Sequence, residues 1–194
     1  RTNLIGLKAD LALVHEGHEL LEQKRQILLL ELKELTAQAA KAQNRVDEEL
    51  AGAYAALRRA RIASGDAAVY SAACATNIVP EITLKERRVM GVSIPGGQFT
   101  LADNAPYYGT HSSSVWTDEA IARFKKALCA IADLAQTRIA VVRLARAIQK
   151  TIRRVNALER ILIPDYEETV KYIQDALEES DRQSFFNLKL VKEH

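Results

Sequence analysis

Few side chains of this sequence have types and spacings that could do chemistry. His15 and His18 lie three residues apart, so on a helix they would share a face and could hold a metal ion together. No third ligand is evident, and such a pair is more often one surface histidine and one packed histidine. We therefore expect no metal site and no cofactor.

Two further groups resemble catalytic or phosphate-binding motifs only in part. Gly96-Gly97 lacks the following Lys-Ser or Lys-Thr of a phosphate-binding loop, so the pair is expected to form a turn. His111 and the serines at 112–114 lack a positioned acid and an oxyanion donor, which a serine nucleophile needs. We expect no catalytic residue and no enzyme activity in the chain by itself.

The composition points to long helices. Aromatic residues make up 6% of the 194 residues, with 8 glycines and 4 prolines, while Ala, Leu, Glu, Lys and Arg dominate, as is typical of coiled coils. The net charge is +2, from 27 basic and 25 acidic residues, which does not favour nucleic-acid binding. Cys74 and Cys129 lie among alanines and are expected to be buried or half-buried free thiols.

Targeting signals are not visible. No stretch reaches about 18 apolar residues, so no membrane insertion is expected. The absence of a signal peptide and of a cysteine framework favours an intracellular location. The chain starts at Arg1 rather than methionine and ends without a helix cap, so its natural ends are expected to extend further.

The first segment, residues 3–63, is predicted to be one helix with a coiled-coil seam. Apolar residues alternate at steps of three and four, which is the period of a left-handed supercoil. The seam comprises Leu4, Leu7, Leu11, Val14, His18, Leu21, Arg25, Leu28, Leu32, Leu35, Ala39, Ala42 and Val46. The helix would be roughly 90 Å long. Ser64-Gly65 should end it, and Asp66 could cap a short new helix.

The middle segment, residues 66–116, is predicted to hold this short helix, a β-hairpin and a loop. Met90, Gly91, Val92, Ile94 and Pro95 are assigned to the hairpin, whose turn is expected at 95–97 with a returning strand over 98–101. An exposed loop through Tyr107 and Tyr108 should follow. These tyrosines and Trp116 could anchor a partner or could pack against the helices.

The last segment, residues 117–192, is predicted to be the second long helix. Thr117 can cap it, and Pro164 should kink it without ending it. The predicted seam comprises Ile121, Phe124, Leu128, Ile131, Ala135, Arg138, Val142, Ala145, Gln149, Ile152, Asn156, Glu159, Ile163, Tyr166, Val170, Ile173 and Leu177. Two such helices around one insert must fold back on each other. We expect a single elongated, mainly α domain: an antiparallel two-helix coiled coil with a short β-hairpin in the middle.

Four stretches together resemble one family. They read LVHEGHELLEQKRQIL (13–28), VMGVSIP (89–95), RRVNALERILIP (153–164) and FFNLKLVK (185–192). In order and spacing they are similar to the D subunit, the central-stalk rotor, of V-type and archaeal-type (A-type) ATPases or ATP synthases, over nearly the whole chain. That family often carries a longer C-terminal tail.

The resemblance implies a function and a set of partners. It implies a non-catalytic rotor shaft that transmits torque between the nucleotide-binding head and the membrane ring, coupling ATP hydrolysis or synthesis to proton or sodium transport. The implied partners are the F subunit of the central stalk, the nucleotide-binding A and B subunits, and the adaptor on the membrane ring. The implied location is cytoplasmic, peripheral to the membrane.

The family motifs suggest a register for the two helices. If residue 60 lies near residue 121, Arg25 falls opposite Asn156 and Glu159, and the two motifs could form a charged layer that fixes the register. Alternatively, Arg25 and Glu159 reach solvent. The motif residues predicted to take part are Lys24, Arg25, Arg153, Arg154, Asn156 and Glu159.

Charged residues also cluster on the second helix. A basic stripe and an acidic tip could meet different partner surfaces, or could simply be solvated faces. The stripe is Arg143, Arg146, Lys150, Arg153 and Arg154, and the tip is Asp165, Glu167, Glu168, Asp175, Glu178, Glu179 and Asp181.

Other classes fit the same pattern. A helix, a hairpin and a second helix also describe prefoldin-like coiled-coil chaperones and static coiled-coil adaptors. A chaperone should form a hexamer alone and suppress aggregation, whereas a rotor shaft should copurify with the F subunit and the ATPase subunits.

Overall fold

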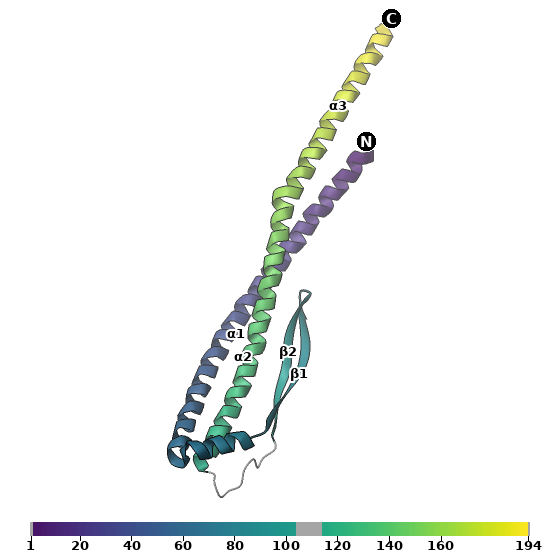
Figure 1. The fold of residues 1–194 in the computed structure, drawn as a ribbon. Coiled ribbons are helices and arrows are strands. Elements are labelled where there is room, and N and C mark those ends of the chain that lie inside the picture. The colour runs from purple at the N-terminus through teal and green to yellow at the C-terminus, as the bar shows by residue number, and fades with distance from the viewer. Residues whose placement is uncertain (1, 104–113, 194) are drawn as a thin grey trace. The chain divides into compact units, whose positions relative to one another are not determined.

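The computed structural model describes residues 2–103 and 114–193, and most of them are helical (Figure 1). The elements in chain order are α1 (Thr2–Ala75), β1 (Ile78–Val89), β2 (Val92–Asp103), α2 (Val115–Ala157), a π-helical turn η1 (Leu158–Leu162) and α3 (Ile163–Glu193). The chain forms two compact units. We call Arg1–Leu29 with Ala147–His194 the terminal unit, and Leu30–Arg146 the middle unit.

In the terminal unit, the start of α1 packs antiparallel to the later helices. His15 lies 3.8 Å from Glu167, while Leu21, further along α1, meets the earlier residue Leu158 in a shared groove. Rising numbers on one helix therefore meet falling numbers on the other. The buried side chains are Leu28, Ile148, Thr151, Val155 and Val170.

In the middle unit, α1 and α2 pack antiparallel through small side chains. Val46 packs with Ala130 and Leu134, and further along α1 Tyr54 contacts Phe124. Most of the other buried residues between these helices are alanines, which let two helices approach closely. They are Ala53, Ala56, Ala60, Ala120 and Ala127.

The seam predicted on the first helix is confirmed. All thirteen of its positions, from Leu4 to Val46, are buried or half-buried, whereas most residues between them are exposed. The helical conformation breaks at Gly65, where φ is 77° and ψ is 160°. Glycine adopts this positive φ without a steric penalty, so it permits the change of direction between the long part of α1 and the short helix that ends at Ala75.

The hairpin is present, but its turn lies five residues before the predicted position. β1 and β2 pair antiparallel with Val89 opposite Val92, so the loop is the two residues Met90 and Gly91. Both have positive φ, 47° and 79°, as a type I′ turn requires. Residues 95–97 instead lie inside β2. Pro95 fits there because each strand of a two-stranded sheet has a free edge, where a missing N–H breaks no pairing.

The second long helix begins earlier than predicted. Thr117 is not its cap, because α2 starts at Val115 and Ser114 takes the capping role. The Ser114 carbonyl accepts hydrogen bonds from the backbone N–H groups of Thr117 (2.8 Å) and Asp118 (3.4 Å), and its Oγ accepts one from Trp116 N–H (3.4 Å). The Thr117 side chain is buried instead.

The seam predicted for the second helix is correct at its C-terminal end and wrong in its centre. Ile163, Tyr166, Val170, Ile173 and Leu177 are buried or half-buried as predicted. Between residues 131 and 159, however, eight of the nine predicted positions are exposed, and only Ile152 is half-buried. The side chains that are buried there instead are Leu134, Ala140, Leu144, Ile148, Thr151 and Val155.

The π-helical turn explains this phase error. Ile163 N–H donates to the carbonyl of Leu158, five residues back, so the turn holds one residue more than an α-helical turn. Inward-facing residues therefore step from 155 to 158 and then to 163. A heptad pattern that is counted backwards from Ile163 without this additional residue therefore assigns the wrong residues to the inward face before the turn. Pro164, which has no N–H to donate, follows directly.

Candidate functional site

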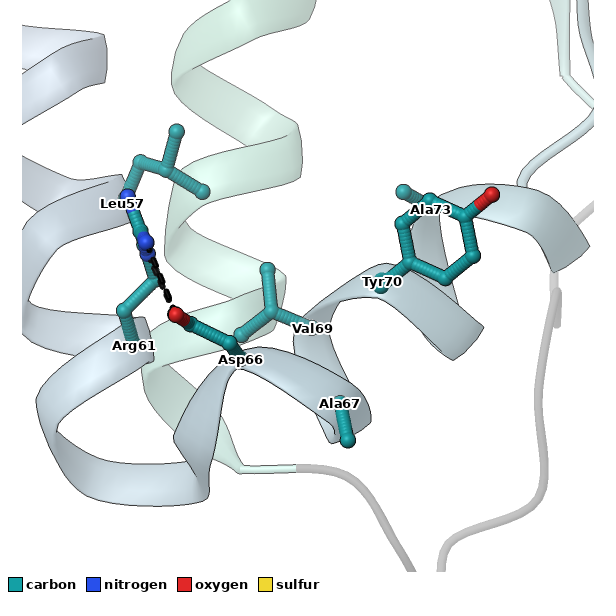
Figure 2. A pocket seen from close by; sticks show the side chains of 7 residues that line it. All are labelled: Leu57, Arg61, Asp66, Ala67, Val69, Tyr70 and Ala73. Atoms are coloured by element: carbon teal, nitrogen blue, oxygen red, sulfur yellow. Dashed lines mark hydrogen bonds and ion pairs between the residues drawn. The ribbon is translucent and has the colours of Figure 1, made fainter.

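The break in α1 creates an open groove with an ion pair at its edge. Figure 2 shows Arg61, from the long part of α1, and Asp66, from the short helix, pointing toward each other. Arg61 Nε donates to Oδ1 of Asp66 at 2.5 Å, and Nη2 donates to Oδ2 at 2.9 Å. The groove has a volume of about 580 Å³ and is lined by Leu57, Arg61, Asp66, Ala67, Val69, Tyr70 and Ala73.

The ion pair shifts the pKa values of both Arg61 and Asp66. The hydrogen bonds from Arg61 lower the pKa of the Asp66 carboxyl below its ordinary value, and those same bonds raise the pKa of the Arg61 guanidinium. Both side chains are exposed, so solvent screens the pair. The two charges among the lining residues satisfy each other, and the rest of the lining is mainly apolar. Exposed surfaces of this mainly apolar kind often mark places where proteins contact each other.

The short helix packs back over the start of α2. Ala72, on the short helix, is buried and lines a narrow apolar cavity of about 240 Å³ with Ala120 and Phe124. Next to it, the Arg59 guanidinium lies 5.8 Å from the ring centroid of Trp116, within cation–π range. Trp116 thus contacts a side chain of α1 and is still 42% exposed, so this contact does not decide between the two roles considered for it. Cys74, on this short helix, is exposed, contrary to expectation, whereas Cys129 is half-buried as expected.

The hairpin lies beside α2 and is attached by few contacts (Figure 1). Ile94, assigned to the hairpin from the sequence, is only 7% exposed. Arg143 Nη1 donates to the carbonyl of Ser93 at 3.2 Å, and Gln136 Nε2 donates to that of Gly97 at 3.3 Å. Arg87 pairs with Glu31 of α1. These partners could not be predicted from the sequence, because contacts between distant segments produce no regular spacing of residues along the chain.

At the tip of the hairpin, Met90 and Gly91 are exposed, and Val92 and Pro95 are half-buried. Among the hairpin residues whose burial is described, Ile94 is the buried one, and the turn is exposed to solvent. The residues assigned to it from the sequence all lie in the turn or in β2.

The structure does not bring the motif residues together as a charged layer. Arg25 is half-buried and pairs with Glu22 on its own helix. Asn156 and Glu159 are exposed, and among the described residues Arg25 bonds to neither of them. The physical reason is the phase shift at η1, which turns Val155 rather than Asn156 inward.

The other motif residues lie at the surface or line a groove. Lys24 is half-buried, and Arg153 and Arg154 are exposed. Arg154 lines an apolar groove of about 490 Å³ with Leu21, Ala157, Leu158, Ile161 and Leu162. All members of the basic stripe and of the acidic tip are exposed.

The two histidines of the pair have different surroundings. His15 faces Glu167, and Nε2 of His18 is buried without a hydrogen-bond partner among the described residues. Within residues 2–103 and 114–193, no group of three or more His, Cys, Asp or Glu side chains is placed to hold a metal ion. Tyr107, Tyr108, His111 and Ser112 lie outside the described residues. In that same part of the chain no helix combines the length and the hydropathy needed to cross a bilayer.

Long helical segments that pack antiparallel in each unit define a coiled-coil protein. The sequence matches the family of the ATP synthase D subunit over residues 3–193. It is 38% identical to the D subunit of the V-type ATP synthase of Thermotoga neapolitana, over 100% of this chain and 95% of that protein. It is 37% identical to the D subunit of the A-type ATP synthase of Thermococcus gammatolerans, over 99% and 91%. The chain therefore belongs to the D-subunit family of V/A-type ATP synthases, the central stalk of a rotary ATPase.

Proposed function

We propose that the chain is the non-catalytic rotor shaft of this complex. It transmits torque between the nucleotide-binding head and the ion-translocating membrane ring, and so couples ATP hydrolysis or synthesis to proton or sodium transport. The observation that carries this proposal is the antiparallel helix packing in each unit, in a chain that matches the family from residue 3 to residue 193. Interlocked helices resist sliding past each other, because one slip breaks many side-chain contacts at once.

The charged surfaces support a coupling role. The basic stripe and the acidic tip both lie on exposed positions of the second long helical segment. A shaft whose faces differ in charge binds each state of the surrounding head with a different free energy. Rotation can then be driven by changes of state in the head, because only such differential binding shifts a conformational equilibrium.

The proposed partners are the F subunit, the nucleotide-binding A and B subunits, and the adaptor of the membrane ring. They would contact four surfaces of the chain: the exposed motif residues Arg153 and Arg154, the half-buried Lys24, the groove beside Arg61, and the hairpin tip at Met90. The chain would work on the cytoplasmic side, peripheral to the membrane. No contact with nucleic acid is proposed, because the net charge is only +2.

Single-molecule rotation tests the proposal. Met90 is exposed at the hairpin tip, so Met90→Cys can carry a bead after Cys74→Ser and Cys129→Ala remove the native thiols. In a complex held by its nucleotide-binding head, we expect the bead to rotate in one direction when ATP is added.

The matched control carries the bead on the head itself, where it should stay still. A stationary bead at Met90 during continued ATP hydrolysis would contradict the shaft role. Formation of a hexamer by the isolated chain, with suppression of client aggregation, would favour a prefoldin-like chaperone instead.

A further inference from the structure

One face of α1 in the terminal unit carries a second heptad stripe whose large apolar side chains are exposed. Leu13, Leu20 and Ile27 are spaced seven residues apart and are 68%, 59% and 41% exposed. The inward seam already uses Val14, Leu21 and Leu28, so these three are additional apolar residues. Large side chains repeated at the heptad period along an exposed helix indicate contact with another helix.

Two glycines lie on the same stripe. Gly6 and Gly17 fall seven and three residues before Leu13 and Leu20, respectively, and both are inside a helix, where only proline is less favourable. A Cβ added at either position would meet nothing within 4 Å, and neither glycine has a positive φ. No contact with a described residue therefore requires glycine there. A bare backbone on an exposed helix face permits the close approach of a second backbone.

Two opposite charges complete the stripe. Asp10 and Lys24 continue the alternating steps of four and three, and neither forms a hydrogen bond or ion pair with another described residue. Together the seven positions, which we call the outer stripe, are Gly6, Asp10, Leu13, Gly17, Leu20, Lys24 and Ile27. They extend over about 32 Å of helix.

We infer that the outer stripe docks an amphipathic α-helix of another subunit of the same rotary complex. The docked helix has apolar residues at heptad spacing, a basic side chain toward Asp10 and an acidic side chain toward Lys24. This inference rests on the proposed function, because it takes the partner from that complex.

The inference also explains the composition of the first family motif. In the stretch from Gly17 to Arg25, Leu21 and Arg25 belong to the inward seam, whereas Gly17, Leu20 and Lys24 belong to the outer stripe. The motif therefore serves two interfaces at once: one within the chain and one with the partner. A motif that served only the coiled coil would not need a glycine at position 17, because a Cβ there would meet no described atom within 4 Å.

Site-specific photocrosslinking in the purified intact complex identifies the occupant. Benzoylphenylalanine is placed at Leu20, and at Gln23 as the matched control on a different face of the same helical turn. Both positions are exposed. We expect irradiation at Leu20 to give an adduct that mass spectrometry maps to one helix of another subunit with apolar residues every three or four positions. An adduct only within this chain, or equal adducts from Leu20 and Gln23, would overturn the inference.

Substitutions test the same face by binding. Leu20→Lys should weaken assembly with the complex lacking this chain by about tenfold or more, since a central apolar side chain of an interface is lost, whereas Gln23→Lys should leave it unchanged. Gly17→Leu should raise the melting temperature of the isolated chain while weakening assembly, a combination that misfolding cannot produce. Unchanged assembly of both stripe variants would overturn the inference.

The outcomes separate this inference from the proposed function. If the stripe variants assemble normally and the bead at Met90 still rotates, the docking face is wrong and the shaft role stands. If the parent chain does not assemble with the complex at all, the shaft role is wrong. Self-association of the isolated chain that is abolished by Leu20→Lys would assign the stripe to a second copy and overturn the inference.

Discussion

Tyr54 of α1 and Phe124 of α2 meet edge to face, with ring centroids 5.6 Å apart and an interplanar angle of 88°. This geometry places the positive edge of one ring against the negative face of the other. The pair lies close to the buried alanines of the middle unit, but Phe124 is half-buried and Tyr54 is 57% exposed, so part of the contact is open to solvent.

We predict that Phe124→Ala lowers the free energy of unfolding by about 2 kcal/mol, because a half-buried ring and its partner contact are lost. A double-mutant cycle with Tyr54→Leu should give a coupling of about 1 kcal/mol. Urea denaturation followed by circular dichroism measures both. Tyr172, which is 73% exposed, serves as the control, and its replacement by alanine should change stability little. A coupling near zero would contradict the ring contact.

The Arg61–Asp66 pair predicts a pH dependence with a definite sign. Its hydrogen bonds lower the pKa of Asp66, so the pair favours the folded chain at pH values above the ordinary pKa of aspartate. That contribution is lost as the pH falls through the lowered pKa. NMR titration of the Asp66 carboxyl should show a midpoint below that of a free aspartate, and Arg61→Gln should return it to the ordinary range. An unchanged midpoint in Arg61→Gln would exclude the pair as the cause.

The turn of the hairpin predicts opposite effects at neighbouring positions. Gly91 has φ 79°, so Gly91→Val should destabilise the hairpin by about 1–2 kcal/mol. Met90, with φ 47°, should tolerate or gain from Met90→Asn, because Asn-Gly is the preferred type I′ pair. Amide hydrogen exchange of β1 and β2 measures the change. Equal destabilisation by both substitutions would argue against a two-residue turn at this position.

The fold class and the first seam could be predicted because both depend on local periodicity. Each inward position from Leu4 to Val46 is three or four residues from the next, and the sequence states that spacing directly. The break at Gly65 was also predictable, since Ser64-Gly65 interrupts the pattern. The turn at Met90 was harder to predict, because methionine rarely adopts a positive φ, whereas Pro95-Gly96-Gly97 has a typical turn composition.

The register of the two helices could not be predicted through the π-helical turn. A heptad assignment assumes a constant number of residues per turn, and the additional residue at 158–162 violates that assumption. Among the described residues Arg25 bonds to neither Asn156 nor Glu159, and both of these are exposed, as the phase shift explains. Contacts such as Arg61 with Asp66 and Arg143 with Ser93 depend on tertiary placement, which no local pattern encodes.

The π-helical turn itself can be tested by shortening the chain. Deleting Arg160 makes Ile163 the fourth residue after Leu158, so an ordinary α-helix would keep both inward-facing. Pro164→Ala in the same variant restores the missing backbone donor. We expect this double change to alter the free energy of unfolding by no more than about 1 kcal/mol, because helix propensity improves while packing is kept.

The matched control deletes Lys150, which is exposed and lies in regular α-helix. That deletion rotates every later residue by about 100° relative to its partner, so stability should fall by several kcal/mol. Equal losses for the two deletions would show that the turn does not absorb the phase difference.

The alanines between the helices of the middle unit carry one further consequence. Alanine has no side-chain torsion, so at these positions neither heat nor load can change the distance between the helices by switching a rotamer. The backbones themselves set the spacing, and any larger residue would have to push them apart. Substitutions that keep the distance between the helices are therefore those at outward-facing positions, where the charge and size of the side chain can vary.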